Sequence, residues 1–241
     1  MDRAIWVTWY DLPVDHRDAH LAWLHGTYIP LVLAKPGLLW AAHYAIQKKT
    51  VHSHDYADRF ATDVPTGNDY MLLFGATDTR CFANPVPSKQ HAALPAADRA
   101  MLAMRGGERV NIFVEDARRD GPEAGTREQG MALSPCIQLG SFNTKDYRDE
   151  EESLDWYANW RMPSMGRLKG CVGIRKLASV AGWAKYGALY EFVSLEARNH
   201  DFMRHEDPYP EMKAWSDRLV PKLKHAPGSA SVGSRIFSAV K

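Results

Sequence analysis

Two stretches of the chain, WLHGTYIPLVLAKPG at residues 23–37 and WYANWRMPSMGRLKG at residues 156–170, decide the fold. Both stretches hold a Trp, a Pro and a Gly at identical spacing, namely Trp23, Pro30 and Gly37 in the first and Trp156, Pro163 and Gly170 in the second. Each Trp lies in a helix-like stretch, preceded by an alternating strand and followed at the Gly by another strand. Recurrence at one constant shift indicates two copies of one structural unit. Both copies therefore begin with strand, helix and strand.

Each half continues with a third strand, a second helix and a closing strand. Short β-prone runs and helical spacing predict these at residues 70–74, 95–104 and 109–115 in the first half, and at 188–192, 210–224 and 235–240 in the second. The order βαββαβ thus occurs twice. This order is that of the ferredoxin-like unit.

The repeat divides the chain into two units and a linker. We predict the first ferredoxin-like repeat at residues 1–116, with a long insertion at 48–68, a linker at 117–133, and the second repeat at 134–241. Two helices cover only one face of such a sheet, and the other face needs a partner. The sequence therefore predicts an α+β protein in which the two sheets pack face to face as an α+β barrel, with a pocket between the sheets.

Composition argues against several classes of partner. Thirty Lys and Arg against 29 Asp and Glu give a net charge of +1, which leaves no electrostatic excess for a nucleic acid or an anionic membrane. Three cysteines without CxxC spacing indicate neither a disulfide framework nor a thiolate metal site. The absence of a signal-like N-terminal run and of any long apolar window predicts a cytoplasmic protein. No nucleotide-binding glycine motif and no GxSxG motif occurs, so we expect no cofactor.

The motif around the first helix carries a family resemblance. In the first half it runs from Trp23 through Tyr28-Ile29-Pro30 to Pro36-Gly37, and in the second half from Trp156 through Arg161-Met162-Pro163 to Lys169-Gly170. In this pattern the chain resembles the dimeric α+β barrel superfamily in its EthD-like branch, fused as a tandem repeat. Members of the superfamily include polyketide cyclases, cofactor-free monooxygenases, lactone isomerases, lyases and haem enzymes. The resemblance thus implies a fold and leaves the reaction open.

The position two residues before the helix proline departs from the family. The family commonly has His there, whereas this chain has Tyr28 in the first half and Arg161 in the second. Tyr28 is a candidate acid, and His25, one turn earlier, is a candidate to tune its proton. Arg161 is a candidate to hold an oxyanion, a carboxylate or a phenolate. The alternatives are a Tyr that only fills space and an Arg that is paired at a helix end.

The strand at residues 38–44 has two chemically different faces. Alternation puts Trp40 and Tyr44 on one face, which suits a ring-binding wall, and His43 on the other, where it is a candidate general base if it faces the cavity. The alternative for His43 is a hydrogen bond at the sheet periphery. In the second half Arg175 stands where the first half has an aromatic wall, so we expect one asymmetric site, placed mainly in the first half.

Glu191 lies in a strand that is apolar on both sides, next to Tyr190. A carboxylate buried there without a partner is costly, so Glu191 either faces a wet cavity as a catalytic group, pairs with a base such as Arg175, or lies at an edge. We assign Tyr190, Arg175 and Arg161 to substrate binding together with the aromatic wall.

The insertion holds an HxH pair, His52 and His54. Such a pair can bind a metal, but no third ligand is evident, and a lid over the cavity is the better functional interpretation. We therefore predict no metal site.

These patterns predict a cofactor-independent enzyme for a small hydrophobic, aromatic or polycyclic compound. Aromatic residues make up 11% of the chain, and Tyr, His, Arg and Glu occupy plausible inward positions. Acid–base chemistry of the lyase, isomerase or cyclase type is the first interpretation. A cofactor-free or haem-dependent monooxygenase and a non-catalytic module that binds hydrophobic ligands are the alternatives. A tandem repeat can be a monomer or a homodimer.

Overall fold

The computed structural model describes residues 1–48, 60–127 and 132–241. The first half holds β1 (Ala4–Asp11), α1 (Arg17–Trp23), α2 (Ile29–Leu33), β2 (Leu38–Ile46), β3 (Tyr70–Ala76), α3 (Pro87–Ala92), α4 (Ala96–Ala103) and β4 (Gly106–Asp120). The second half holds β5 (Cys136–Asn143), α5 (Tyr147–Trp156), α6 (Met162–Met165), β6 (Cys171–Gly182), β7 (Tyr186–Phe192), α7 (Leu195–His200), α8 (Pro210–Leu219), β8 (Lys224–His225) and β9 (Ser231–Val240). His52 and His54, the candidate metal pair, lie outside the described residues, as does most of the predicted lid.

Eight strands form one closed antiparallel barrel. The first half pairs in the order β4–β1–β3–β2 and the second in the order β9–β5–β7–β6. The edges of the two sheets then join, β2 to β9 and β4 to β6, so that each half covers the exposed edges of the other. The predicted fold class, two βαββαβ repeats whose sheets face each other, is confirmed.

Strand β4 extends beyond the predicted end of the first repeat. Residues 117–120, expected in the linker, continue β4 to Asp120 and pair with β6, as in the pair Ala117↔Lys176. Residues 111–114 of β4 pair with β1 on one edge and with β6 on the other, and the extension past a bulge lengthens the pairing that closes the barrel against the second half.

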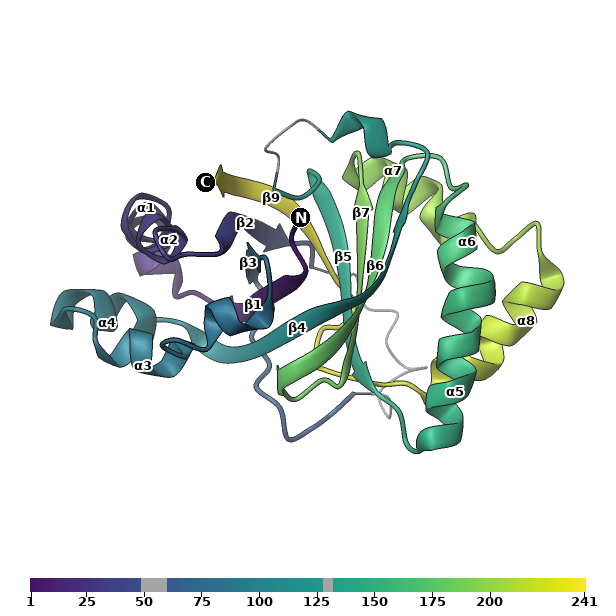
Figure 1. Ribbon diagram of the computed structural model, residues 1–241, viewed down its shortest axis with the longest axis horizontal. Coiled ribbons are helices and arrows are strands. Elements are labelled where there is room, and N and C mark those ends of the chain that lie inside the picture. The colour runs from purple at the N-terminus through teal and green to yellow at the C-terminus, as the bar shows by residue number, and fades with distance from the viewer. Residues whose placement is uncertain (49–59, 128–131) are drawn as a thin grey trace.

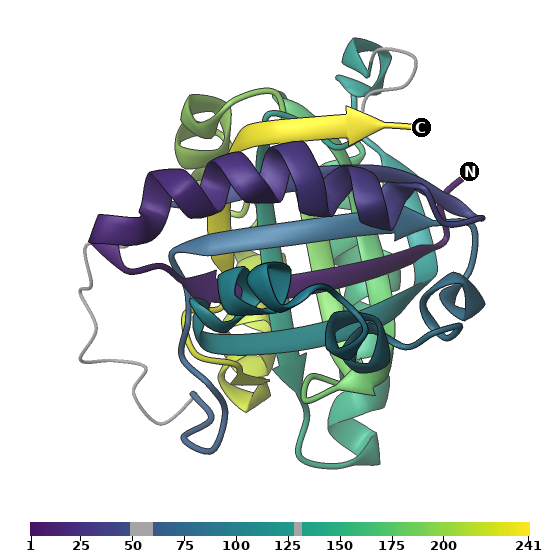
Figure 2. The ribbon, with the colours of Figure 1, turned by 90° about the vertical axis from the view of Figure 1, so that its left-hand side faces the viewer.

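Helices cover the outer faces of the barrel. Figure 1 shows α1 to α4 on one side of the strands and α5, α6 and α8 on the other. In Figure 2, α1 and α2 lie across the first sheet, and the C-terminal strand β9 runs beside β2. In the part of the chain that the structure describes, no helix is long and apolar enough to cross a membrane.

Three hydrophobic cores follow from this layering. One lies between the first sheet and its helices, one between the second sheet and its helices, and one inside the barrel. Buried side chains, among them Trp9, Trp40, Tyr44 and Phe113, occupy the barrel interior. The space between the sheets, which the sequence predicted as the pocket, is thus largely a packed core.

Both first helices contain a π-helical turn at matching positions. The turn spans Leu24–Tyr28 in the first half and Tyr157–Arg161 in the second, and Pro30 or Pro163 is the second residue of the short helix that follows. Proline lacks an amide hydrogen, and its ring clashes with the carbonyl four residues earlier in a regular α-helix. The wider π turn relieves that conflict, and such turns are frequent at functional sites. The last residue of each turn, Tyr28 or Arg161, is buried.

Candidate active site

The structure separates residues that the sequence analysis placed around one enclosed space. His25, Tyr28 and His43 belong to the layer between the first sheet and its helices. Trp40, Tyr44, Arg175 and Glu191 lie inside the barrel. Arg161 and Tyr190 lie between the second sheet and its helices.

Inside the barrel, Glu191 and Arg175 form an ion pair, which was one of the alternatives for Glu191. Nε of Arg175 lies 3.4 Å from Oε1 of Glu191, and Nη1 of Arg175 bonds Asp2 from the first half. Glu191 also accepts from Nη2 of Arg127 at 2.9 Å and from the Ser134 amide at 3.2 Å. With both carboxylate oxygens engaged and the side chain fully buried, Glu191 is held as a structural counter-ion.

The aromatic wall of β2, Trp40 and Tyr44, hydrogen-bonds to residues that contact Arg175 or Glu191. Trp40 donates from Nε1 to Oδ2 of Asp2 at 3.1 Å, and the Tyr44 hydroxyl donates to the Ser134 carbonyl at 2.8 Å. Burial alone would raise the pKa of Asp2, but Arg175 and Arg118 lower it overall. Asp2, just before β1, thus bonds Arg175 of β6, which in turn pairs with Glu191 of β7, so these contacts link the start of the first half to the second sheet.

The layer of the first half contains a hydrogen-bonded chain of three side chains. His25 Nε2 lies 2.8 Å from His43 Nδ1, and His43 Nε2 lies 2.8 Å from the Tyr10 hydroxyl. His43 is fully buried, and burial, followed by the charges of His25 and Arg105, holds its pKa well below the usual value. His25 is half-buried, so the chain leads from the surface to Tyr10.

Tyr28 does not pair with His25, as the sequence suggested, but with His91. The Tyr28 hydroxyl lies 2.6 Å from Nε2 of His91. The predicted pair assumed α-helical spacing, in which residues three apart are neighbours, whereas the π turn at Leu24–Tyr28 rotates them apart. Burial raises the pKa of Tyr28 and lowers that of His91 to about 4, so both are neutral near pH 7.

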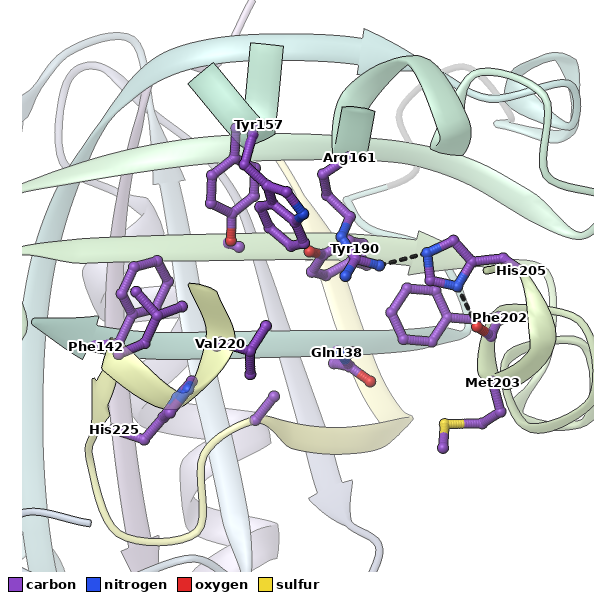
Figure 3. Close-up of a pocket in the computed structure, with 15 residues that line it drawn as sticks. Gln138, Phe142, Tyr157, Arg161, Tyr190, Phe202, Met203, His205, Val220 and His225 are labelled. Atoms are coloured by element: carbon purple, nitrogen blue, oxygen red, sulfur yellow. Dashed lines mark hydrogen bonds between the residues drawn. The ribbon is translucent and has the colours of Figure 1, made fainter. Parts of the chain in front are cut away.

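A cavity of about 300 Å³ opens between the second sheet and its helices. Figure 3 shows Tyr157 and Arg161 reaching into it from the first helix, with His205 facing Arg161 across one end. Five aromatic side chains line it, namely Phe142, Trp156, Tyr157, Tyr190 and Phe202, together with aliphatic ones such as Val220 and Leu223. The cavity is therefore an apolar slot with a polar end.

Arg161 forms that polar end. Its Nη2 donates to Oε1 of Glu206 at 3.0 Å, its Nη1 lies 2.5 Å from Nε2 of His205, and its guanidinium lies 4.3 Å from the ring centre of Trp156. Only 7% of the residue is exposed, and its Nε finds no hydrogen-bond acceptor among the described side chains. A buried N–H without an acceptor, on a side chain that lines a cavity, is a candidate donor for an oxygen anion.

His205 has one nitrogen that can accept a proton. Nδ1 lies 2.6 Å from the Phe202 carbonyl oxygen. Because a carbonyl oxygen only accepts, Nδ1 carries the hydrogen and Nε2 of the neutral ring carries the lone pair. Burial and then Arg161 lower the pKa of His205 to about 4. Sequence reasoning missed His205 and Glu206 because they follow α7 in an irregular stretch without periodicity, where only the polar run His-Glu-Asp before Pro208 marks them.

Haem does not fit this cavity as the side chains stand. A haem site needs an axial side-chain ligand for iron and room for a macrocycle. Both nitrogens of His205 are engaged as the side chains stand, Nε2 with Arg161 and Nδ1 with the Phe202 carbonyl. About 300 Å³ is the lower limit for small-molecule pockets, and a tetrapyrrole is larger than the ligands such pockets hold. Within the described ranges no group of three or more His, Cys, Asp or Glu residues could hold a metal ion.

Comparison with solved structures places the chain among barrel proteins. An anthrone oxidase-like protein matches with a TM-score of 0.61 at 9% identity, covering 100% of this chain and 94% of that one. A candidate monooxygenase from Fusobacterium nucleatum matches at 0.60 and 9% identity, covering 100% and 95%. A candidate chlorite dismutase matches at 0.53 and 13% identity, covering 98% and 96%.

The resemblance lies in structure and not in sequence. No protein-family model and no curated protein matches the sequence. Identities of this size show the fold alone, and they do not single out the EthD-like branch. The chain has the dimeric α+β barrel fold, with one chain supplying both halves of the barrel.

Proposed function

We propose that the protein is a cofactor-independent monooxygenase that oxidises a hydroxylated polycyclic aromatic compound with O₂ in the cavity of the second half. Two similar structures, an anthrone oxidase-like protein and a candidate monooxygenase, support oxidation over the lyase, isomerase or cyclase chemistry that was our first interpretation. The haem-dependent form of the alternative is not favoured, because the cavity does not fit haem.

The proposal rests on the Nε–H of Arg161, which has no acceptor and belongs to a side chain at the polar end of the cavity. Cofactor-free oxidation requires an electron-rich substrate anion, since only such an anion gives electrons to O₂ readily. A guanidinium stabilises a phenolate or enolate oxygen through directed donors. Aromatic walls fix the ring system and exclude water, which strengthens that interaction.

The reaction converts a ring CH₂ group that is conjugated with a ketone through the aromatic rings, as in anthrone, into a carbonyl. Nη1 of Arg161 turns from Nε2 of His205 to the substrate oxygen, which frees Nε2 to take the first proton from carbon, and the resulting enolate oxygen binds Arg161. The ring carbanion forms a bond to O₂, and His205 returns its proton to the peroxide. The O–O bond then breaks as the second C–H proton is lost, which leaves one oxygen as C=O and the other as water. The enolate raises the low pKa of His205, because an opposite charge stabilises the imidazolium.

Arg161→Met tests this assignment. With anthrone as the probe, we expect kcat/KM for O₂ uptake to fall at least 100-fold, about 2.7 kcal/mol of transition-state stabilisation. Arg218→Met is the matched control, because it removes an exposed guanidinium of the same half and should leave turnover unchanged. Mass spectrometry of the product distinguishes the alternatives.

Each alternative predicts a different outcome of the same assay. Product formation without O₂ would support the lyase or isomerase chemistry. Saturable binding of a wide panel of aromatic compounds with no product would support the binding module. Activity that appears only after haem is added, with a Soret band, would support the haem-dependent oxidation.

A further inference from the structure

A charged side chain fixes the orientation of an amide in the wall of the second-half cavity. Arg198, in α7, donates from Nε at 2.9 Å and from Nη2 at 2.6 Å to the same oxygen, Oε1 of Gln138 in β5. A guanidinium carries donors only, so it binds the oxygen of an amide and never its nitrogen. Gln138 therefore turns its oxygen toward Arg198, and its NH₂ group is left for another partner.

That NH₂ group belongs to a residue that lines the cavity. Gln138 is buried and forms part of the cavity wall. It lies opposite Tyr190 of β7 in the strand register, so both side chains leave the face of the sheet that the helices cover. Nε2 of Gln138 makes no hydrogen bond to any residue in the described ranges. An amide with unused donors in a cavity wall is suited to an acceptor oxygen of a ligand.

Arg198 acts on this amide as a charged donor. Its remaining bond, from Nη1, goes to Oδ1 of Asn199 at 2.9 Å, so within the described part of the chain its hydrogen bonds go to neutral amides alone. Its guanidinium also lies 5.7 Å from the ring centre of Phe202, which lines the cavity. A hydrogen bond from a charged group polarises the amide that accepts it, which makes the N–H groups of Gln138 better donors.

The cavity thus offers donors from both of its walls. Figure 3 shows Gln138 on a strand of the sheet and Arg161 extending from the helix above it. Nε of Arg161 has no acceptor among the described side chains, and the NH₂ group of Gln138 is likewise unused. A flat ring system in the slot satisfies both groups only if it carries one acceptor oxygen toward the helix and another toward the sheet.

We propose that Gln138 is a specificity-determining residue, which donates to a second acceptor oxygen on the edge of the substrate that faces the sheet. The inference rests on the proposed function for the role of the cavity as the substrate site, and it narrows the substrate class to polycyclic ketones with acceptor oxygens on two edges. A compound with an N–H on the second edge is rejected, because two donors then face each other. Arg198 is a positioning residue, since it acts through Gln138.

Two three-ring compounds of nearly the same shape test the proposal without any oxidation. Anthraquinone has an acceptor oxygen on each of two opposite edges, whereas acridone has a carbonyl on one edge and an N–H on the other. Neither compound has a CH₂ group to oxidise, so equilibrium dialysis measures their dissociation constants free of turnover. We expect the unmodified protein to bind anthraquinone about tenfold more tightly than acridone, because in either orientation of acridone a protein donor faces the N–H.

Substitutions separate recognition from a structural role. Gln138→Glu keeps an oxygen for Arg198 and removes the NH₂ group, so it should fold and should reverse the preference, because the carboxylate accepts from the acridone N–H. Arg198→Met frees the amide to turn over, which should bring the two dissociation constants within about threefold of each other. Arg161→Met removes a donor that the carbonyl of either compound uses, so it should weaken both. Gln47→Glu, the same change at an exposed position, should leave the preference unaltered.

The preference for anthraquinone is the result that decides the proposal. Its survival in Gln138→Glu that is folded by circular dichroism would overturn the proposal. Equal binding of the two compounds by the unmodified protein would do the same, as would no saturable binding of either one up to its limit of solubility. Turnover of anthrone tests the proposed oxidation separately, because anthrone carries its only oxygen on one edge and needs no second acceptor to be oxidised.

Discussion

The two halves share one backbone plan but carry different chemistry in corresponding layers. Both have a first helix with a π turn before a proline, both place four strands in the order expected of a ferredoxin-like unit, and both bury a guanidinium against aromatic rings. In the first half, imidazoles and tyrosines hydrogen-bond one another, as in Tyr28–His91. In the second half the same layer opens a cavity of about 300 Å³.

One position accounts for much of this difference. Tyr28 points into its layer and meets His91, so that two rings occupy the space under the helix. Arg161, at the matching position, is drawn toward Glu206 and His205 at one end of its layer. The shared Trp, Pro and Gly fix the helix in both halves, so the last residue of the π turn can change from Tyr28 to Arg161 without a change of fold. That residue then determines what the layer between helix and sheet can bind.

The largest expected effect concerns the contacts that hold the halves together. Arg175→Met removes a buried cation that pairs with Asp2 of the first half and Glu191 of the second. We expect unfolding free energy to fall by about 3 kcal/mol, the lower end of the cost of breaking a buried pair, because Arg118 and Arg127 remain as partners.

Denaturant titration measures this change, with Arg80→Met as the control. Arg80 pairs with Asp78 at an exposed site, and its loss should change stability by no more than about 0.5 kcal/mol. Equal effects of the two substitutions would contradict the view that the ion pairs of Arg175 with Asp2 and Glu191 join the two halves.

Two glycines on matching third strands should respond unequally to the same change. Both face the barrel interior, but a Cβ on Gly75 would lie 2.0 Å from the Trp40 ring, whereas one on Gly187 would lie 3.2 Å from the Phe113 ring. We expect Gly75→Ala to cost about 2 kcal/mol by overpacking and Gly187→Ala to cost less than about 1 kcal/mol. Thermal unfolding compares them, and similar losses would mean that the two sheets pack the core alike.

Most of the fold could be predicted from the sequence, because turns and strands require particular residue types at particular spacings. Proline and glycine at a constant shift gave the repeat, and alternation separated Trp40 and Tyr44 from His43 correctly. Alternation cannot tell which face meets helices, since both faces of a barrel strand are buried. The aromatic wall was therefore assigned to a pocket, and the structure places it in the packed interior.

The candidate site was readable only in part. Arg161 and Tyr190 do line a cavity, and Arg175 does pair with Glu191. His205 and Glu206 were missed because their contacts with Arg161 cross 44 and 45 residues of sequence without any local pattern. The pairing of His25 with Tyr28 was wrong because a π turn is invisible to helical periodicity.

Acid should weaken the first half more than the second. The first half holds the buried His20 and His43 and the half-buried His91, all with lowered pKa values, and the second half holds the half-buried His205. Above pH 6.5 these groups are neutral in both folded and unfolded states. Between pH 6.5 and about 4 the unfolded chain binds protons that the folded chain does not, so stability is lost as pH falls.

We expect about 1 kcal/mol of lost stability for each such imidazole at pH 5, after allowing for partial solvent screening. Hydrogen exchange followed half by half at pH 7.5 and pH 5 would show protection lost first in α1 and its sheet. His20→Gln should flatten the pH dependence by about one such increment. Uniform loss of protection in both halves would contradict the difference.

The smallest expected effect is also the one that decides which half does the chemistry. Tyr28→Phe removes one hydroxyl and keeps the ring, so it breaks the bond to His91 and leaves the cavity of the second half untouched. If oxidation occurs at Arg161, kcat/KM with anthrone should change less than about twofold, while stability falls by about 1 kcal/mol for the lost buried hydrogen bond. Tyr190→Phe, the matched change in a residue that lines the cavity, should alter kcat/KM more. A fall of tenfold or more for Tyr28→Phe, about 1.4 kcal/mol of transition-state stabilisation, would instead place the reaction in the first half, where Tyr28, His25 and His43 were first assigned as catalytic residues.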